Sequence, residues 1–206
     1  MKNKLTRALV PALLLGLLTV GVTGCSVAVP APTTTQTPST TPDASSLSDI
    51  TAKLAEQAPA AGTDAAVAWE ALTGPDGEYA AAASYQAVLD KFGQVEPYAT
   101  ILSAELKHIN ALTRQLERAG VTVPANPYLG NLEAPADLEA AARAWAEGEI
   151  LNVEMYDKLL TQTSDSNLTR VLTNLRRSSQ ESHLPMFELA AVNGGTLTAD
   201  QMPAGH

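Results

Sequence analysis

The spacing of apolar residues from position 75 onward predicts four long helices. Apolar side chains recur there every three or four residues, and this spacing places them on one face of a helix. We expect helices over residues 75–92, 97–119, 135–161 and 167–192. Pro97 stands in the first turn of the second helix and Gly120 follows its end, which is the usual asymmetry of helix boundaries. Pro185 falls inside the fourth helix and is expected to kink it.

The lengths of the connections predict how these helices are arranged. About four residues join the first helix to the second, and about five join the third to the fourth, so each pair should be antiparallel. The connection over residues 120–134 would reach about 50 Å when extended. The second helix is about 35 Å long at its expected length. This connection can therefore cross the whole bundle and leave the second and third helices parallel, which predicts an all-α four-helix bundle with one long crossover.

Each predicted helix carries an ionisable residue on its apolar face. Glu105 and His108 are three residues apart on the second helix and share the face of its apolar side chains. Glu78, Glu149 and His183 hold similar positions on the first, third and fourth helices. A buried carboxylate or imidazole needs a proton, a polar partner or a metal ion. The five side chains are therefore candidate metal ligands, although each one alone could be a solvated acid or a core histidine with a backbone partner.

A weak internal repeat relates the two halves of the predicted bundle. Tyr85 follows Glu78 by seven residues, and Tyr156 follows Glu149 by seven residues. A histidine comes later in each half, as His108 and His183. Two hairpins that each carry Glu, Tyr and His predict a site near a pseudo-two-fold axis, with chance and simple packing of the tyrosines as the alternatives.

Between residues 70 and 192 the chain resembles the ferritin-like superfamily, and more narrowly an uncharacterised family of exported bacterial ferritin-like proteins, a domain of unknown function. The segments that carry the resemblance are Gly77-Glu78-Tyr79-Ala80, Phe92-Gly93 through Pro97-Tyr98, Ala104-Glu105 with His108, Glu149 through Met155-Tyr156-Asp157, and His183-Leu184-Pro185-Met186-Phe187. The superfamily pattern is Glu on one helix, Glu-x-x-His on the next, and the same two again. The resemblance therefore implies that Glu105 and Glu149 are bridging or shared carboxylates, Glu78 is a terminal ligand, and His108 and His183 are nitrogen ligands.

The fourth helix departs from this pattern. Gln180, not a glutamate, stands three residues before His183. Three carboxylates bring a charge of −3 against +4 for two divalent ions, so we expect one tightly bound metal ion and a second that is weaker or absent. Gln180 is a candidate for an amide oxygen ligand, and it joins Tyr85 and Tyr156 as an expected neighbour of the ligands.

The beginning of the chain predicts export and a lipid anchor. Residues 1–24 combine basic Lys2, Lys4 and Arg7 with an apolar run over residues 8–22, which is typical of a signal peptide. Cys25 follows at the position of the lipidated residue in a bacterial lipobox, and an ordinary signal peptide with an unrelated cysteine is the alternative. We therefore expect a lipoprotein anchored through Cys25 to the outer face of the bacterial cell membrane.

The remaining segments complete the expected domain organisation. Residues 25–45 are rich in Thr and Pro and predict a disordered tether. A weakly helical extension is expected over residues 46–73, the bundle over 74–193, and a disordered tail over 194–206. Cys25 is the single cysteine, so no disulfide is expected within the chain.

Charge and ligand types narrow the functional hypotheses. The net charge is −9, and it would be −12 without Lys2, Lys4 and Arg7, which argues against a nucleic-acid partner. Carboxylate and imidazole ligands suit iron or manganese, in a mononuclear or dinuclear centre, with zinc as a further candidate. The first hypothesis is a metal enzyme with oxidase or ferroxidase-type chemistry. The alternatives are a non-catalytic lipoprotein that binds or stores metal, and a structural, partner-binding bundle without metal.

Overall fold

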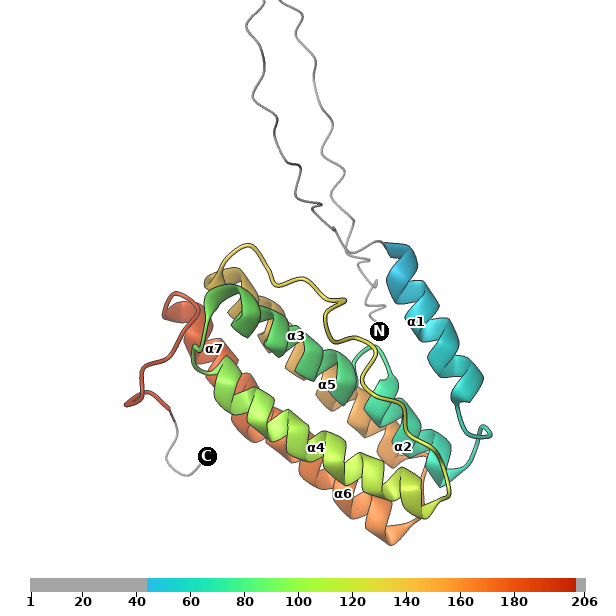
Figure 1. Cartoon of the computed structure of the whole chain (residues 1–206). Helices are drawn as coiled ribbons and strands as arrows, with labels where there is room; N and C mark the ends of the chain where they lie inside the picture. The colour runs from blue at the N-terminus through green and yellow to red at the C-terminus, as the bar shows by residue number, and fades with distance from the viewer. Residues whose placement is uncertain (1–43, 203–206) are drawn as a thin grey trace, which may run out of the picture. The chain divides into compact units, whose positions relative to one another are not determined.

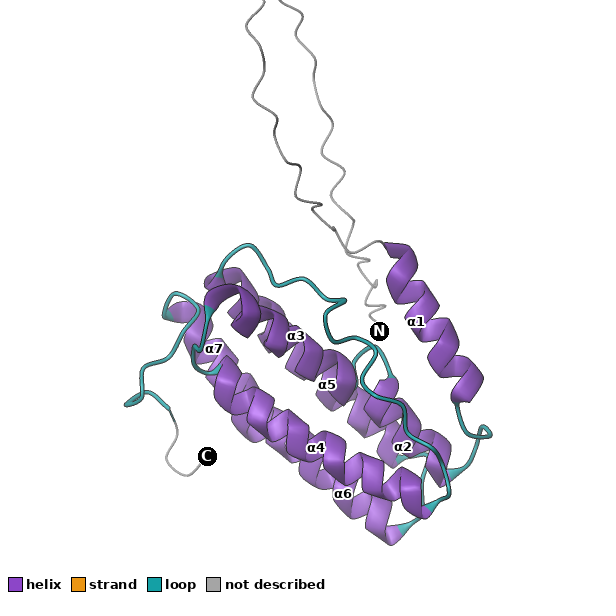
Figure 2. Ribbon diagram, in the orientation of Figure 1, coloured by secondary structure: helices purple, strands orange, loops and turns teal. Residues whose placement is uncertain are grey.

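The computed structural model describes residues 44–202, and it describes their side chains from residue 47 onward. This part of the chain is helical and contains no strand, which confirms the all-α expectation (Figure 2). The four predicted helices are present, with ends within three residues of those expected. The elements are α1 (Ala44–Gln57), α2 (Asp64–Thr73), α3 (Glu78–Phe92), α4 (Tyr98–Arg118), α5 (Leu138–Leu160), α6 (Ser166–Ser178), the π-helical segment η1 (Ser179–His183) and α7 (Leu184–Val192).

Two helical hairpins and a long crossover make up the bundle. Helix α3 packs against α4, and α5 packs against α6, η1 and α7. The loop over residues 119–137 runs along the bundle from the end of α4 to the start of α5, so α4 and α5 point in the same direction (Figure 1). Two tyrosine hydroxyls fasten this loop: Tyr79 donates to the Pro124 carbonyl at 2.7 Å, and Tyr128 donates to the Thr73 carbonyl at 3.0 Å. The crossover is therefore an ordered part of the structure.

Helix α2 belongs to the core, whereas the sequence predicted a weakly helical extension over residues 46–73. It begins at a Thr63 cap whose hydroxyl accepts from the Ala66 N–H, and it packs against α3, α4 and α5. Trp69 and Leu72 are buried in the same apolar cluster as Leu112 and Leu172. The prediction that this segment lies outside the bundle is wrong for residues 64–73, because seven of the ten side chains of α2 are apolar and can be buried on more than one face.

Pro185 changes the helix that the sequence predicted over residues 167–192. A proline has no N–H, and its ring crowds the carbonyl four residues earlier, so regular α-helical bonding cannot pass it. The chain widens into η1 directly before Pro185, and the Leu184 N–H donates to the Ser179 carbonyl five residues earlier. The helix continues as α7 after this π-helical segment.

The segment that follows α7 is packed, whereas a disordered tail was expected from residue 194. Gly194 and Gly195 have φ values of 74° and 92°, and they turn the chain back toward the bundle. Leu197 is then buried in an apolar cluster with Phe187, and its N–H donates to the Glu96 carbonyl at 2.9 Å. The expectation of disorder is wrong for residues 194–202, because a single leucine within reach of an apolar surface is enough to fasten this short segment.

Replacement of Gly195 by alanine should destabilise the protein. An added Cβ would lie 2.1 Å from the Leu138 carbonyl carbon, at a φ that alanine disfavours. We expect the free energy of unfolding to fall by about 2–4 kcal/mol, measured by urea denaturation. Gly130→Ala is the control, because Gly130 also has a positive φ but has nothing within 4 Å of its Cβ position. Equal losses in the two variants would show that the close approach to Leu138 has no energetic consequence.

The expectations for the beginning of the chain lie outside the described residues. They concern the signal peptide, the lipid on Cys25 and most of the tether; of the tether, only residues 44 and 45 are described, at the start of α1. Among the helices of residues 44–202, none combines the length and apolar character needed to cross a membrane.

Candidate metal centre

The five ionisable residues singled out in the sequence form one cluster inside the bundle. They lie between two apolar regions of the core, one containing Leu112 and Leu172 and the other containing Ile101 and Phe187. Glu78, Glu105, Glu149 and His183 are each at most 2% exposed, and the side chain of His108 is 13% exposed. An unpaired charge would be strongly unfavourable in the interior, so the hydrogen bonds and charge pairs among these groups determine what the site can bind.

Local helix geometry brings the three carboxylates inward. Glu105 and His108 are three residues apart on α4 and lie on the same face. Glu78 is the first residue of α3, where the helix dipole favours a negative charge. The preceding Gly77 permits a close approach to α2, because a Cβ there would lie 2.6 Å from the Ala71 carbonyl oxygen. Glu149 lies near the middle of α5, about two helical turns before Tyr156 on the same face.

The π-helical segment sets the orientation of His183. Its wider turn brings residues five apart together, and Ser178 Oγ lies 3.1 Å from His183 Nε2. The other ring nitrogen of His183, Nδ1, faces Glu105 and Glu149. Ser179, also in this segment, donates to Asn152 Oδ1 on α5 at 2.8 Å, and Asn152 donates to the Asp76 carbonyl at 2.9 Å. These contacts tie η1, α5 and the start of α3 together around the cluster.

Glu105 is shared by the two halves of the cluster. Its Oε2 lies 2.8 Å from His108 Nδ1, and its Oε1 lies 2.9 Å from His183 Nδ1. Glu78 Oε2 lies 3.4 Å from His108 Nδ1, and Glu149 Oε1 lies 3.5 Å from His183 Nδ1. The two imidazole rings are stacked with their centroids 5.6 Å apart. Each half therefore contains one glutamate and one histidine of its own, with Glu105 between them.

The two tyrosines cross between the halves. Tyr85 of α3 donates to Glu149 Oε1 on α5 at 2.5 Å, and Tyr156 of α5 donates to Glu78 Oε1 on α3. Because each tyrosine follows a glutamate by seven residues, the crossed pairs require α3 and α5 to be antiparallel. Each phenol leaves Oε2 of its carboxylate without a hydrogen bond. In Glu78 this free oxygen is the one that approaches His108, whereas in Glu149 the oxygen bonded by Tyr85 is the one that approaches His183.

Burial and mutual charge shift the pKa values of the cluster strongly. Burial raises the pKa of Glu78 to about 8, and the neighbouring Glu105 carboxylate adds to this shift. Burial lowers the pKa of His108, but Glu78 and Glu105 outweigh it and raise the value to about 11. Burial also lowers the pKa of His183, but Glu105 and Glu149 outweigh it and raise the value to about 10. Without a metal ion, the histidines therefore hold protons that balance the buried carboxylates.

The unbonded atoms of the cluster fit a metal ion. Glu78 Oε2, Glu149 Oε2 and His183 Nδ1 are buried and lack a hydrogen-bond partner, since the short approach of His183 Nδ1 to Glu105 does not have hydrogen-bond geometry. Such orphaned groups are rare in protein interiors. The five residues of the cluster form two sets of three, and in each set one ligand atom per residue lies within 4.8 Å of the others. One set is Glu78, Glu105 and His108, and the other is Glu105, Glu149 and His183. The donor set could hold one ion in each half.

Gln180 does not join this cluster, so its expected place beside the ligands is wrong. It is exposed, and its amide oxygen accepts from Arg176 at 2.5 Å. Its place in the core is taken by the neighbouring Ser179, because η1 alters the helical phase before His183. Sequence reasoning missed Asn152 and Ser178, although Asn152 follows Glu149 by three residues and so could have been found on the same face.

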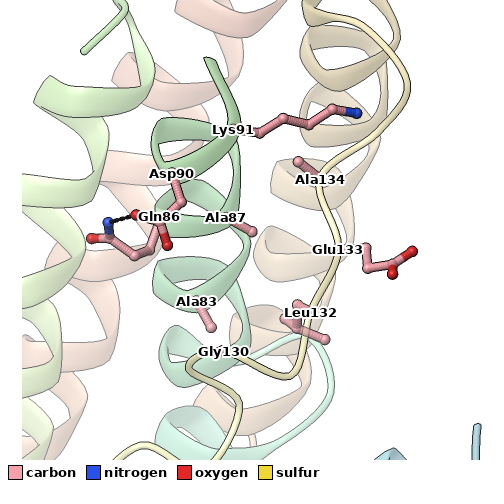
Figure 3. Close-up of a pocket in the computed structure, with 9 residues that line it drawn as sticks. All are labelled: Ala83, Gln86, Ala87, Asp90, Lys91, Gly130, Leu132, Glu133 and Ala134. Carbon is pink, nitrogen blue, oxygen red and sulfur yellow. Dashed lines mark hydrogen bonds between the residues drawn. The ribbon is translucent and has the colours of Figure 1, made fainter. Parts of the chain in front are cut away.

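A separate cavity of about 560 Å³ lies away from the cluster, between α3 and the crossover loop. Figure 3 shows Ala83 and Ala87 of α3 facing Leu132 and Ala134 of the loop. Its charged side chains do not converge: Asp90 accepts from Gln86, and Lys91 reaches the Pro135 carbonyl. This cavity offers no set of ligands comparable with the buried cluster.

Comparisons with known proteins found no family to which this chain is similar. No protein-family model matches the chain, and neither the curated proteins nor the solved structures gave a match. The carboxylate–histidine cluster in the bundle is therefore the observation on which a function can be based.

Proposed function

We propose that this protein binds transition-metal ions in the core of a ferritin-like bundle. The position of Glu105 carries the proposal: each of its oxygens approaches a different histidine, and each histidine has a further glutamate beside it. The order of the helices and the long parallel crossover are consistent with the ferritin-like arrangement. Glu105 would bridge two ions, with Glu78 and His108 completing one half and Glu149 and His183 the other.

The ligand types support iron or manganese, with zinc as a further candidate. No thiolate is present in the cluster, and three carboxylates with two neutral imidazoles supply −3 against +4 for two divalent ions. We therefore expect the first ion to bind more tightly than the second. Tyr85 and Tyr156 would hold the carboxylates in position. The expected lipid on Cys25 would place this centre at the outer face of the cell membrane.

Elemental analysis and calorimetric titration of the purified protein would test the metal centre. The protein from metal-replete medium should contain up to two ions per chain. His108→Ala and His183→Ala should each lose one of the two sites, because each removes one ligand from one of the two sets of three. Gln180→Ala is the control and should keep both, since Gln180 is exposed and outside the cluster. Unchanged stoichiometry in a Glu105→Ala/His108→Ala double variant would exclude the cluster as the metal site.

A further inference from the structure

Three hollows on the described part of the chain reach residues of the buried cluster. One of about 270 Å³ lies between α3 and α5 and is lined by Tyr85 and Glu149. Another of about 280 Å³ reaches His183 between α4 and the region where α6 passes through η1 into α7. The third, of about 440 Å³, reaches His108. These three hollows are therefore candidate routes by which an ion could reach the cluster in the folded bundle.

The hollow between α3 and α5 differs from the other two in the charged residues that line it. Exposed Asp76 and Glu147 line it, and no lysine or arginine does. The hollow at His183 is lined by Lys107 and by no acidic residue. The hollow at His108 is lined by Arg177 together with Glu181, whose charges oppose each other. A cation is therefore attracted to the first hollow and repelled or unaffected at the others.

The same hollow is lined by a cluster residue that has an unsatisfied ligand atom. Glu149 lines it and is 2% exposed; Tyr85 donates to its Oε1, and its Oε2 has no hydrogen-bond partner. Five of its thirteen lining residues are small: Ala80, Ala81, Ser84, Ala144 and Gly148. A Cβ added at Gly148 would meet only Trp145 Cε3, at 3.6 Å. Small residues thus form part of the wall of a hollow that reaches the buried Glu149 side chain.

We propose that divalent cations reach the centre through the hollow between α3 and α5, where Asp76 and Glu147 attract them and Glu149 receives them. This inference rests on the proposed metal-binding function and adds the route and the order of filling. The half that contains Glu149 and His183 is filled first, since it adjoins the hollow. Asp76 and Glu147 are positioning residues for uptake and are not ligands of the bound ion.

Stopped-flow absorbance with Co²⁺ under anaerobic conditions tests the route. The purified metal-free protein is mixed with Co²⁺ at low ionic strength, and both the rate and the final stoichiometry are recorded. Asp76→Asn/Glu147→Gln should bind the same number of ions about tenfold more slowly, and added salt should shrink the difference. The matched control is Glu154→Gln/Glu188→Gln, which removes two exposed acids that do not line this hollow.

A second pair of variants tests the passage itself. Gly148→Leu should slow uptake at every salt concentration because the larger side chain fills the hollow, whereas Gly148→Ala should bind at the wild-type rate. Circular dichroism confirms that each variant is folded.

The outcomes of these experiments distinguish a failure of the proposed uptake route from a failure of the proposed metal centre. Normal stoichiometry with unchanged rates in both Asp76→Asn/Glu147→Gln and Gly148→Leu would overturn the route and leave the metal centre intact. Equal slowing in Glu154→Gln/Glu188→Gln would show that only net charge matters and would also overturn it. Absence of Co²⁺ binding by the wild-type protein would overturn the metal centre, and the route with it.

Discussion

Replacement of Glu105 by glutamine is expected to weaken the binding of both metal ions by at least about a hundredfold, since even the loss of a group behind a ligand costs about 10- to 100-fold. Glutamine keeps the shape of the side chain but removes the negative charge. Its NH₂ group would also face one of the two histidine nitrogens that now lie within 2.9 Å of a carboxylate oxygen. Affinities measured by competition with a chelator would give the effect for each ion.

The neighbouring glutamates provide the matched controls for this prediction. Glu78→Gln should weaken mainly the ion held with His108, and Glu149→Gln mainly the ion held with His183. All three substitutions are equally conservative and lie at equally buried positions. If Glu105→Gln weakened only one ion, or if Glu78→Gln weakened both to the same extent, Glu105 would not be the shared ligand.

Metal binding should raise the midpoint temperature of unfolding by roughly 10 °C. An ion present at about a thousand times its dissociation constant stabilises the folded state by about 4 kcal/mol. For a chain of this size, each kcal/mol corresponds to about 2–4 °C. The stabilisation should disappear with a chelator and should fall to about a third or less in Glu105→Gln, whose binding is about a hundredfold weaker. Scanning calorimetry of the two proteins with and without Mn²⁺ or Zn²⁺ would measure both effects.

This stabilisation should grow as the pH rises. The folded-state pKa values of His108, about 11, and His183, about 10, lie above the ordinary value of 6.5, so their contribution to the metal-free protein is complete below pH 6.5 and is lost toward pH 10–11. The pKa of Glu78 is raised from 4.5 to about 8, so its contribution to the stability of the metal-free protein is also lost as the pH rises between these two values. The metal-free protein should therefore lose stability as pH rises from about 6 to 9.

Metal binding responds to pH in the opposite direction, because an ion must displace these protons. Up to three are released near pH 7, one each from Glu78, His108 and His183. The difference in midpoint temperature between the metal-bound and metal-free protein should thus widen from about pH 6 to 9, with proton release measured by an indicator dye. A constant difference over this range would show that the ion does not compete with the cluster's protons.

The sequence alone was sufficient to predict the four long helical segments and the five ionisable residues of the cluster. Helical periodicity is a local property, so the apolar face of each helix could be traced without knowing its neighbours. Glu105 and His108 interrupt such a face three residues apart, and Glu78, Glu149 and His183 interrupt the others. The length of the crossover also limited the arrangement, because only a long connection can leave two successive long helices parallel.

The tertiary structure decided which of these groups meet and at which atoms. Only contacts between helices show that Glu105 lies between both histidines and that Tyr85 and Tyr156 bond across the two halves. Tertiary packing also placed α2 and Leu197 in the core, and the backbone around η1 turned Gln180 outward. Periodicity along one helix says which face is buried, whereas the partner of a buried group depends on residues distant in the chain, whose approach is set by packing.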